Sequence, residues 1–320
     1  MRIALIGYGH VGKAFARLLQ AKRSIFPFRI VGIHTLRHGT AYSEAGVSFE
    51  PKWQSSASTL EEFLLRSQPE VAIEITTLNP EDGEPAISHI RAAFARQIHV
   101  ITANKGPIAH AYSSLCDEAR RRQVEFRFES TVMDGTPVFS NVRNNLPGIK
   151  VLGFRGVLNS TSKVVLAAMQ RGLSMEDGIR EAQAMGVTEA DPWYDIDGWD
   201  SAAKAAALAN VLMDARTSPQ AVDRTGLRDI GVEDPARLAR AGRTIQLVSS
   251  GECVDGAVRL QVRPEILDQN DLLATVKATS NVLLLHTDLM GTIGTVSIDP
   301  GVEQTAYGLF SDLVDIAKSV

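Results

Sequence analysis

Acidic side chains and one lysine are concentrated between Gly186 and Lys204, where the chain reads GVTEADPWYDIDGWDSAAK. Asp200 and Lys204 are four residues apart at the start of an alanine-rich segment with helical character, so they share one helix face. Such a pair is usually only a surface salt bridge. Beside a dense acidic loop it could instead exchange a proton with a bound hydroxyl group.

A glycine-rich turn, GYGHVG over Gly7–Gly12, follows the strand predicted at Arg2–Ile6 and opens a predicted helix. Gly7 permits the tight turn, Gly9 lets the backbone approach a pyrophosphate, and Gly12 lets helix and strand pack closely. The helix N-terminus favours the anion. In this strand–turn–helix context the turn predicts a dinucleotide site.

The residues after the second predicted strand bear on the choice of cofactor. An NAD-preferring site often places Asp or Glu about 20 residues past the glycines. Here the stretch His34–His38 reads HTLRH and contains no carboxylate. Arg37 could pair with a 2′-phosphate, which favours NADP and leaves NAD open. The alternative is that Arg37 is a solvated loop cation.

Composition excludes several classes of protein. Of 320 residues, 44% are hydrophobic and 22% are charged, and the net charge is −4, which excludes a fibrous or disordered chain and gives no electrostatic footprint for nucleic acid. No apolar stretch approaches the roughly 18 residues of a membrane span, and the N-terminus lacks a signal-peptide layout. Two cysteines, Cys116 and Cys253, lack CxxC spacing and fit a reducing compartment. We therefore expect a cytoplasmic globular protein.

Short apolar strands alternate with helical segments over residues 1–140. The pattern predicts a doubly wound, Rossmann-like parallel sheet within an α/β class. Strands are predicted at Arg2–Ile6, Arg29–His34, Val71–Ile75, His99–Thr102 and Glu125–Glu129, and helices at Gly12–Ala21, Leu60–Arg66, Pro85–Arg96 and Ala111–Arg122.

The pattern loses its strict alternation after residue 140, and residues 141–300 predict a second α+β domain with an open mixed sheet, for substrate binding, catalysis and dimerisation. Its strands are predicted at Lys150–Leu158, Ala257–Val262, Asn281–Thr287 and Thr292–Ile298, and its helices at Thr161–Arg171 and Ser201–Leu212. A closing helix at Thr305–Ile316, within residues 301–320, is expected to pack back on the first domain.

Three further segments carry a resemblance to a known family. They are TANK at Thr102–Lys105, ESTVMDGTP at Glu129–Pro137, and the acidic block from Gly186 to Lys204. Together with the glycine turn, they resemble the homoserine dehydrogenases, in order and over nearly the whole chain. We expect the form without the C-terminal regulatory domain that some members carry.

The resemblance implies roles for individual residues. Lys204 would be the catalytic acid/base, and Lys105 a second catalytic lysine at the reacting oxygen and the cofactor. The substrate would be bound by Glu189, Asp200, Ser160, Thr161 and Asp195. The cofactor would be bound by Gly7, Gly9, His10, Val11, Gly12, Arg37, Thr76, Thr77, Ala103, Lys105, Gly186 and Gly301.

Residues 129–136 resemble the family's monovalent-cation loop, in which mostly backbone oxygens hold sodium. The matching positions are Glu129, Val132, Asp134 and Thr136, and a plain strand-to-helix turn is the alternative interpretation. The resemblance also implies a homodimer formed through the sheet of the second domain. The other partner expected is a small-molecule substrate, with no nucleic acid and no membrane.

The implied reaction interconverts L-homoserine and L-aspartate 4-semialdehyde with NAD(P), a step of threonine and methionine biosynthesis. Four positions depart from the family pattern: Ser160 and Lys163, where Gly and Asn are usual, Val187, where Tyr is usual, and Pro300 in a glycine-rich segment. They leave open an enzyme of the same type acting on another small hydroxy acid or aldehyde. A second alternative, a non-catalytic nucleotide-binding sensor, would not need to keep both lysines and the carboxylates.

Overall fold

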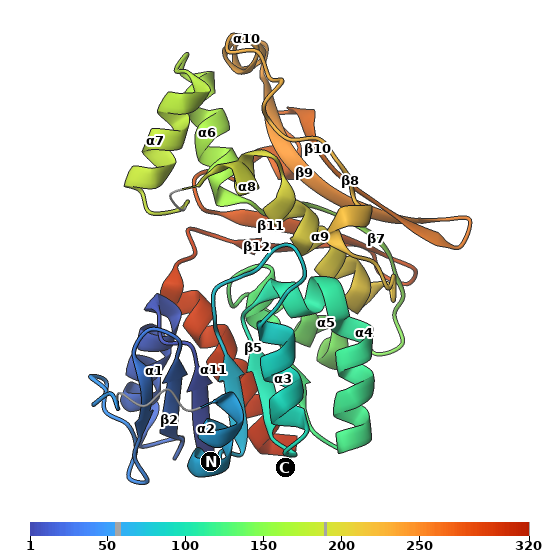
Figure 1. Cartoon of the computed structure of the whole chain (residues 1–320). Helices are drawn as coiled ribbons and strands as arrows, with labels where there is room; N and C mark the ends of the chain where they lie inside the picture. The colour runs from blue at the N-terminus through green and yellow to red at the C-terminus, as the bar shows by residue number, and fades with distance from the viewer. Residues whose placement is uncertain (55–58, 189–190, 320) are drawn as a thin grey trace. The chain divides into compact units, whose positions relative to one another are not determined.

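The computed structural model describes residues 1–54, 59–188 and 191–319. The chain divides into two compact units, which are described separately below (Figure 1). The first unit comprises residues 1–140 and 301–320, and the second comprises residues 141–300. The chain therefore leaves the first unit once and returns to it.

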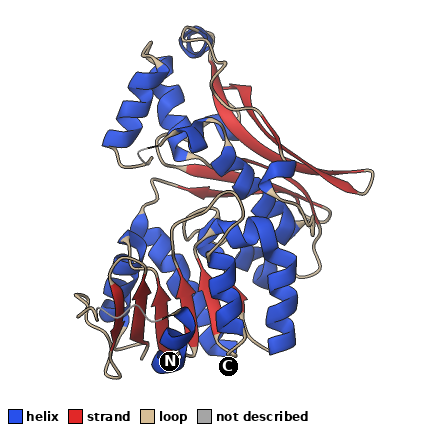
Figure 2. Cartoon of the chain, in the orientation of Figure 1, coloured by secondary structure: helices blue, strands red, loops and turns tan. Residues whose placement is uncertain are grey.

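A six-stranded sheet with the order β3-β2-β1-β4-β5-β6 forms the centre of the first unit (Figure 2). This is the strand order of the doubly wound dinucleotide-binding fold, so the predicted fold class is confirmed. The strands are β1 (Arg2–Ile6), β2 (Arg29–Thr35), β3 (Gly39–Tyr42), β4 (Val71–Glu74), β5 (His99–Thr102) and β6 (Phe126–Arg127).

The sheet differs from the prediction at its two edges. β3 was not predicted, and it pairs antiparallel with β2, because the three-residue turn between them is too short for a parallel crossover. At the other edge, β6 covers only Phe126–Arg127 of the strand predicted at Glu125–Glu129. Glu129 instead begins the 3-10 helix η1 (Glu129–Thr131).

Helices cover both faces of this sheet (Figure 1). α2 (Leu60–Ser67), α3 (Ala86–Phe94) and α4 (Lys105–Arg122) form one group, while α1 (His10–Lys22) packs against the closing helix α11 (Val302–Ser319). The core between α1, α11 and the sheet is apolar and includes Ile3, Leu5, Phe15, Leu19, Ile73, Ile101, Leu309, Leu313 and Ile316. Burial of these side chains is the main force that holds α11 on the first unit.

Two glycines let α11 approach the loop that follows η1. A Cβ atom on Gly308 would lie 2.2 Å from Ser130 Oγ and 2.7 Å from the Cα of Gly135. The Ser130 hydroxyl donates to the Thr305 carbonyl at 2.8 Å, and the Asp312 carboxylate accepts from the Glu129 N–H at 2.9 Å. Helix and loop are thus in direct backbone contact.

The second unit contains a mixed, open sheet with the order β12-β11-β7-β9-β10-β8. Its neighbours pair antiparallel, except that β8 pairs parallel with β10. The strands are β7 (Val151–Val157), β8 (Asp223–Arg224), β9 (Arg243–Val254), β10 (Ala257–Asp268), β11 (Asn281–Thr287) and β12 (Gly291–Ser297). The predicted α+β character is therefore confirmed, although the long hairpin β9–β10 was foreseen only over Ala257–Val262.

Helices of the second unit lie on one face of its sheet, where α6 and α9 contact β9. The helices are α6 (Ser160–Gln170), α7 (Met175–Ala184), α8 (Trp193–Ile196), α9 (Trp199–Leu212) and α10 (Asp234–Arg240), with 3-10 turns η2 (Pro219–Ala221) and η3 (Leu272–Ala274). α5 (Phe139–Asn145) begins in the first unit and ends in the second.

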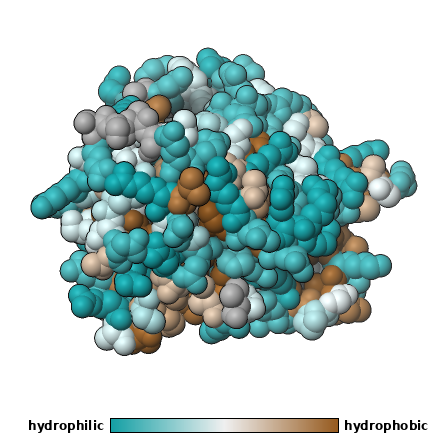
Figure 3. Space-filling view, turned by 60° about the horizontal axis from the view of Figure 1, so that its bottom comes forward, coloured by the Kyte–Doolittle hydropathy of each residue, from teal (hydrophilic) through white to brown (hydrophobic). Residues whose placement is uncertain are grey.

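Hydrophilic side chains predominate on the surface seen in Figure 3, where apolar side chains gather only in small groups. Small apolar groups of this kind are normal on protein surfaces. Among the described helices, none combines the length and the apolar composition that a membrane span requires.

Replacing Gly308 with alanine tests the close contact between α11 and the loop. Helix propensity alone would make this change stabilising by about 1 kcal/mol. Because the new methyl group would collide with Ser130 and Gly135, we expect a destabilisation of about 1–3 kcal/mol instead. The measurement is the free energy of unfolding by denaturant titration. The control is Ser311→Ala, at an exposed position of the same helix, and a stabilised G308A variant would disprove the contact.

Candidate active site

The glycine turn lies at the carboxyl end of β1, where the backbone is tightly constrained. Gly7 has φ +103°, and a Cβ atom there would lie 2.5 Å from the Ile75 carbonyl oxygen. Its N–H donates to the His34 carbonyl at 2.9 Å. Gly9 is the N-cap of α1, and no described atom lies within 4 Å of the place of a Cβ atom. The turn therefore has the strained entry and the open helix N-terminus that suit a pyrophosphate.

The other candidate cofactor residues of the first unit lie at the same edge of the sheet. Because β1, β4 and β5 are parallel, their carboxyl ends bring the glycine turn, Thr76–Thr77 and Ala103–Lys105 to one edge. Lys105 is the first residue of α4 and is half-buried. His10 is exposed, Val11 is half-buried, and Gly301 is exposed at the start of the returning segment.

Arg37 is exposed in the turn between β2 and β3. β2 is parallel to β1, so this turn also belongs to the carboxyl edge of the sheet. The neighbouring His38 ring stacks on Trp53 with 5.3 Å between ring centroids, and Trp53 contacts Tyr8 of the glycine turn edge-on at 6.1 Å. Aromatic packing thus ties the turn with Arg37 to the glycine turn.

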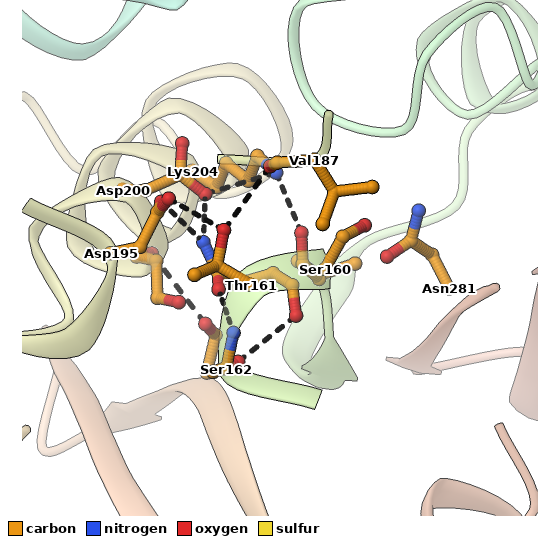
Figure 4. Close-up of polar contacts among 12 residues, drawn as sticks. Ser160, Thr161, Ser162, Val187, Asp195, Asp200, Lys204 and Asn281 are labelled. Carbon is orange, nitrogen blue, oxygen red and sulfur yellow. Dashed lines mark hydrogen bonds and ion pairs between the residues drawn. The ribbon is translucent and has the colours of Figure 1, made fainter. Parts of the chain in front are cut away.

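A network of carboxylates and hydroxyls occupies the N-terminal ends of three helices in the second unit (Figure 4). Asn159 is the N-cap of α6, and its Nδ2 donates to Asp195 Oδ1 at 2.7 Å and to Asp200 Oδ2 at 2.9 Å. Thr161 Oγ1 donates to Asp195 Oδ2 at 2.7 Å. Asp195 lies on α8 and Asp200 on α9, so this network joins α6, α8 and α9.

Lys204 completes this group from the second turn of α9. Its Nζ lies 3.1 Å from Asp200 Oδ2 and donates to the Leu158 carbonyl at 2.6 Å. The exposed fractions of the two side chains are 15% for Lys204 and 10% for Asp200, so the pair is not the solvated salt bridge that the spacing alone suggested. A partly buried amine held beside two carboxylates is suited to exchanging a proton with a bound hydroxyl.

The electrostatics of the site are dominated by burial. Burial raises the pKa of Asp195, and the nearby Asp200 charge raises it further, while hydrogen bonds from Thr161 and Asn159 and the charge of Lys204 lower it. Burial and the same two carboxylates also raise the pKa of the Tyr194 phenol, so Tyr194 stays neutral at neutral pH. Among the described residues, its hydroxyl has no hydrogen-bond partner.

The other candidate site residues have fewer contacts with this network or lie outside it. Ser160 Oγ donates to the Thr279 carbonyl at 3.4 Å, and Gly186 lies in an exposed turn after α7 with φ +69°. Val187 is at one position that departs from the family pattern, and its carbonyl oxygen lies 3.2 Å from Thr161 Oγ1. Glu189 lies outside the described residues. Lys105 belongs to the first unit and Lys204 to the second.

Lys163, another departure from the family pattern, is buried in α6, with 3% of its surface exposed. Its Nζ donates to the Ser280 carbonyl and, at 2.8 Å, to Asn281 Oδ1. The ammonium therefore connects α6 with the start of β11 inside the second unit.

Cation–π contacts hold the acidic loop on its outer side. The Arg224 guanidinium lies 3.8 Å from the centroid of Trp199, and that of Arg228 lies 4.0 Å from the centroid of Trp193. Arg228 also forms an ion pair with Asp197, which lowers the pKa of that carboxyl. These aromatic side chains thus anchor the loop that carries Asp195.

The candidate cation loop is shaped by the Glu129 side chain. Its carboxylate accepts from the N–H groups of Val138 at 2.6 Å, Phe139 at 2.8 Å and Ser140 at 2.6 Å, and so caps α5. Asp134 has φ +57°, and the Thr136 N–H donates to the Met133 carbonyl at 3.0 Å. Within the described part of the chain, no group of three or more His, Cys, Asp or Glu side chains could hold a metal ion.

Asn159 is a site residue that the sequence analysis did not select. Asparagine between a strand and a helix is the usual signal for an N-cap, and Asn159 does accept from the Ser162 N–H at 2.7 Å. Its second role, in bridging two carboxylates from distant segments, leaves no local signal.

Comparisons with known proteins agree over the whole chain. The family model for homoserine dehydrogenase matches residues 137–314, and the model for the homoserine dehydrogenase NAD binding domain matches residues 7–129. An NAD(+)-dependent homoserine dehydrogenase from Pseudomonas canavaninivorans is 33% identical, over 99% of this chain and 96% of its own length. A homoserine dehydrogenase from Methanocaldococcus jannaschii is also 33% identical, over 100% and 99%.

Solved structures show the same likeness. A homoserine dehydrogenase from Thermoplasma acidophilum superposes with a TM-score of 0.87 at 25% identity and covers 99% of both chains. A hyperthermophilic archaeal homoserine dehydrogenase in complex with NADPH has a TM-score of 0.85 at 26% identity, over 100% of this chain and 98% of its own. Motifs, fold and comparisons thus agree, and the chain belongs to the homoserine dehydrogenase family of NAD(P)-dependent oxidoreductases.

Proposed function

We propose that the protein interconverts L-homoserine and L-aspartate 4-semialdehyde by hydride transfer with NAD(P). The observation that carries this proposal is the placement of Lys204 at 3.1 Å from Asp200, within the network of Asn159, Asp195 and Thr161. The bound nicotinamide would accept the hydride in oxidation and donate it in reduction. What remains for the chain is to hold the substrate and to move one proton.

In this proposal Lys204 takes the hydroxyl proton during oxidation and returns it to the carbonyl oxygen during reduction. Its bond to the Leu158 carbonyl fixes the direction of the amine. Asp200 and Asp195, with Glu189 from outside the described residues, replace the hydration of the substrate ammonium. Ser160 and Thr161 supply hydroxyls to the substrate, and Lys105 is the second lysine at the reacting oxygen.

Oxidation of L-homoserine, followed at 340 nm with NADP⁺ and NAD⁺ in parallel, tests this assignment. In Lys204→Ala we expect kcat to fall about 100-fold or more, because general acid/base groups contribute that much. Cofactor binding should be retained. Lys318→Ala, which removes an exposed lysine from α11, is the matched control.

Undiminished turnover by the K204A variant would contradict the role of Lys204. If the wild-type protein binds cofactor but does not turn over homoserine, the substrate is another small hydroxy acid or aldehyde, as the departures at Ser160, Lys163 and Val187 allow. A protein that binds cofactor and turns over none of these would be a nucleotide sensor.

NADP is the cofactor that we propose as preferred, with NAD accepted less well. Support comes from Arg37, which is exposed at the cofactor edge of the first unit where an NAD site usually has a carboxylate. The relatives include both an enzyme named as NAD(+)-dependent and a structure in complex with NADPH, so the preference must come from residues of this chain.

Replacing Arg37 with alanine tests this preference. Loss of one charge-assisted bond to a 2′-phosphate should raise the KM for NADP⁺ about tenfold and leave the KM for NAD⁺ unchanged. Arg121→Ala, at an exposed position near the other end of α4, is the control. Equal changes for both cofactors would show that Arg37 is a solvated loop cation.

A monovalent cation such as sodium is part of the proposal for the loop of residues 129–136. Support comes from Glu129, whose carboxylate is committed to three N–H groups of α5 and therefore holds the loop in shape. In that arrangement the loop would offer backbone oxygens of Glu129, Val132, Asp134 and Thr136. Oxygen ligands of this kind are those that hard cations prefer.

We also propose a cytoplasmic homodimer that associates through the second sheet. Residues directly opposite each other in antiparallel strands share one face. By this rule Arg155, Leu284 and Val296 share one face with the buried Val282. Asn281, which bonds to α6, and Ser249, which bonds to α9, alternate with them along the strands and so belong to the other face. Val296 is 55% exposed on its face.

The cysteines bear on the proposed cytoplasmic location. Cys116 and Cys253 form no disulfide within the described chain, as suits a reducing compartment.

Substituting Val296 with aspartate tests the dimer. We expect the wild type to have twice the chain mass of 34.7 kDa in light scattering after gel filtration, and V296D to shift toward the monomer. The side chain is already exposed, so folding should be preserved. The control is Leu65→Asp, at an apolar position of α2 that is 70% exposed. A monomeric wild type, or a V296D variant that remains dimeric, would refute this interface.

A further inference from the structure

Glu74 is a buried carboxylate at the carboxyl end of β4, to which the proposed reaction gives no role. It is 0% exposed. A carboxylate removed from water is costly unless hydrogen bonds replace its hydration. Three donors do so here: the Thr76 N–H at 2.9 Å and the Thr76 hydroxyl on one oxygen, and the Thr102 hydroxyl at 2.8 Å on the other.

These bonds belong to a closed ring of four residues. The Thr102 hydroxyl, which donates to Glu74, also accepts from the Asn104 N–H at 2.9 Å. The Asn104 amide returns to the Thr76 carbonyl at 3.4 Å. Hydrogen bonds thus link four residues in a ring, in the order Glu74, Thr76, Asn104, Thr102 and back to Glu74. The parallel register that pairs Glu74 with Thr102 brings the side chains of these two residues together.

The ring joins two loops that leave the sheet at the same edge. One loop, after β4, contains Thr76–Thr77, and the other, after β5, consists of Ala103–Asn104 and leads into α4 at Lys105. Asn104 is also the N-cap of α4, because its Oδ1 accepts from the Gly106 N–H at 3.0 Å. The ring therefore fixes where α4 begins, and Lys105 is the first residue of that helix.

We propose that Glu74 is a positioning residue: through the ring it holds Thr76–Thr77 and the start of α4 at Lys105 in the arrangement that binds the cofactor and presents Lys105. The identity of what these loops hold rests on the proposed function. Glu74 itself touches neither substrate nor cofactor. Its effect on the reaction is exerted through Thr76, Asn104 and Thr102.

Glutamine at position 74 breaks the ring with little change of shape. An amide can accept from Thr76 on its oxygen, but its NH₂ group meets the Thr102 hydroxyl, which must then leave its own proton without a partner. Loss of one buried hydrogen bond of the ring predicts a rise of about tenfold in the dissociation constant of NADPH. We expect kcat to fall as well, while the KM for the hydroxy substrate, held by the second unit, changes by less than about twofold.

The control is Glu70→Gln, which removes a carboxylate just before the opposite end of β4, where Glu70 accepts from the Arg2 N–H at 2.6 Å. A second pair of variants covers the case in which E74Q does not fold. Thr102→Val opens the ring and should reproduce the effect on NADPH binding. Thr102→Ser keeps the hydroxyl and should retain the wild-type affinity for NADPH. In the double variant E74Q/T102V the effects should not add, because both changes break one network.

NADPH binding is measured by fluorescence titration without substrate, so it remains readable even if the protein does not oxidise homoserine. Amide hydrogen exchange of residues 75–77 and 103–106 provides a second readout that needs no ligand, and we expect it to accelerate in E74Q and T102V but not in E70Q. Unchanged NADPH binding and exchange in both ring variants would overturn the proposal. So would equal effects in E70Q, since the loss would then reflect general destabilisation.

Discussion

The Asn159 amide donates to Asp195 and to Asp200, and the arrangement of the second unit's site depends on this shared donor. Two carboxylates brought out of water repel each other unless donors and a cation compensate them. Asn159 and Thr161 supply the donors, and Lys204 supplies the cation at 3.1 Å from Asp200. Each bond to a charged group contributes about 1.5–3 kcal/mol, so the cluster is stable only when all three helices are in place.

The first unit also contains buried carboxylates, and these are stabilised by hydrogen bonds. Glu74 and Glu129 are both buried, and each carboxylate receives three hydrogen bonds. In both cases these hydrogen bonds fix the position of nearby backbone: Glu74 fixes two loops at the sheet edge, and Glu129 caps α5. Acidic residues thus serve as fixed points for the loops, at Thr76–Thr77 and in residues 129–136, that are proposed to meet ligands.

Much of the fold and several of the candidate site residues were predictable from local sequence patterns. Two of these patterns are local and can be recognised without knowledge of the fold. They are Gly7 in its strand–turn–helix context and the spacing of Asp200 and Lys204. Glu74 and Asn159 escaped because their partners are remote in sequence: Thr102 is 28 residues from Glu74, and Asp200 is 41 residues from Asn159. β3 and β9 were missed for a related reason, since their strand character depends on pairing with neighbours rather than on alternation.

The return of α11 to the first unit has a consequence for biosynthesis. Leu309, Leu313 and Ile316 fill the same core as Phe15 and Leu19, yet they leave the ribosome only after the whole second unit has been made. Until then, the nascent dinucleotide-binding unit exposes an apolar strip on α1 and the sheet, the kind of surface that chaperones recognise and that favours aggregation. The second unit and α11 must therefore both be made before the first unit can finish folding, and a ribosome stalled before α11 would display an incomplete nucleotide-binding unit.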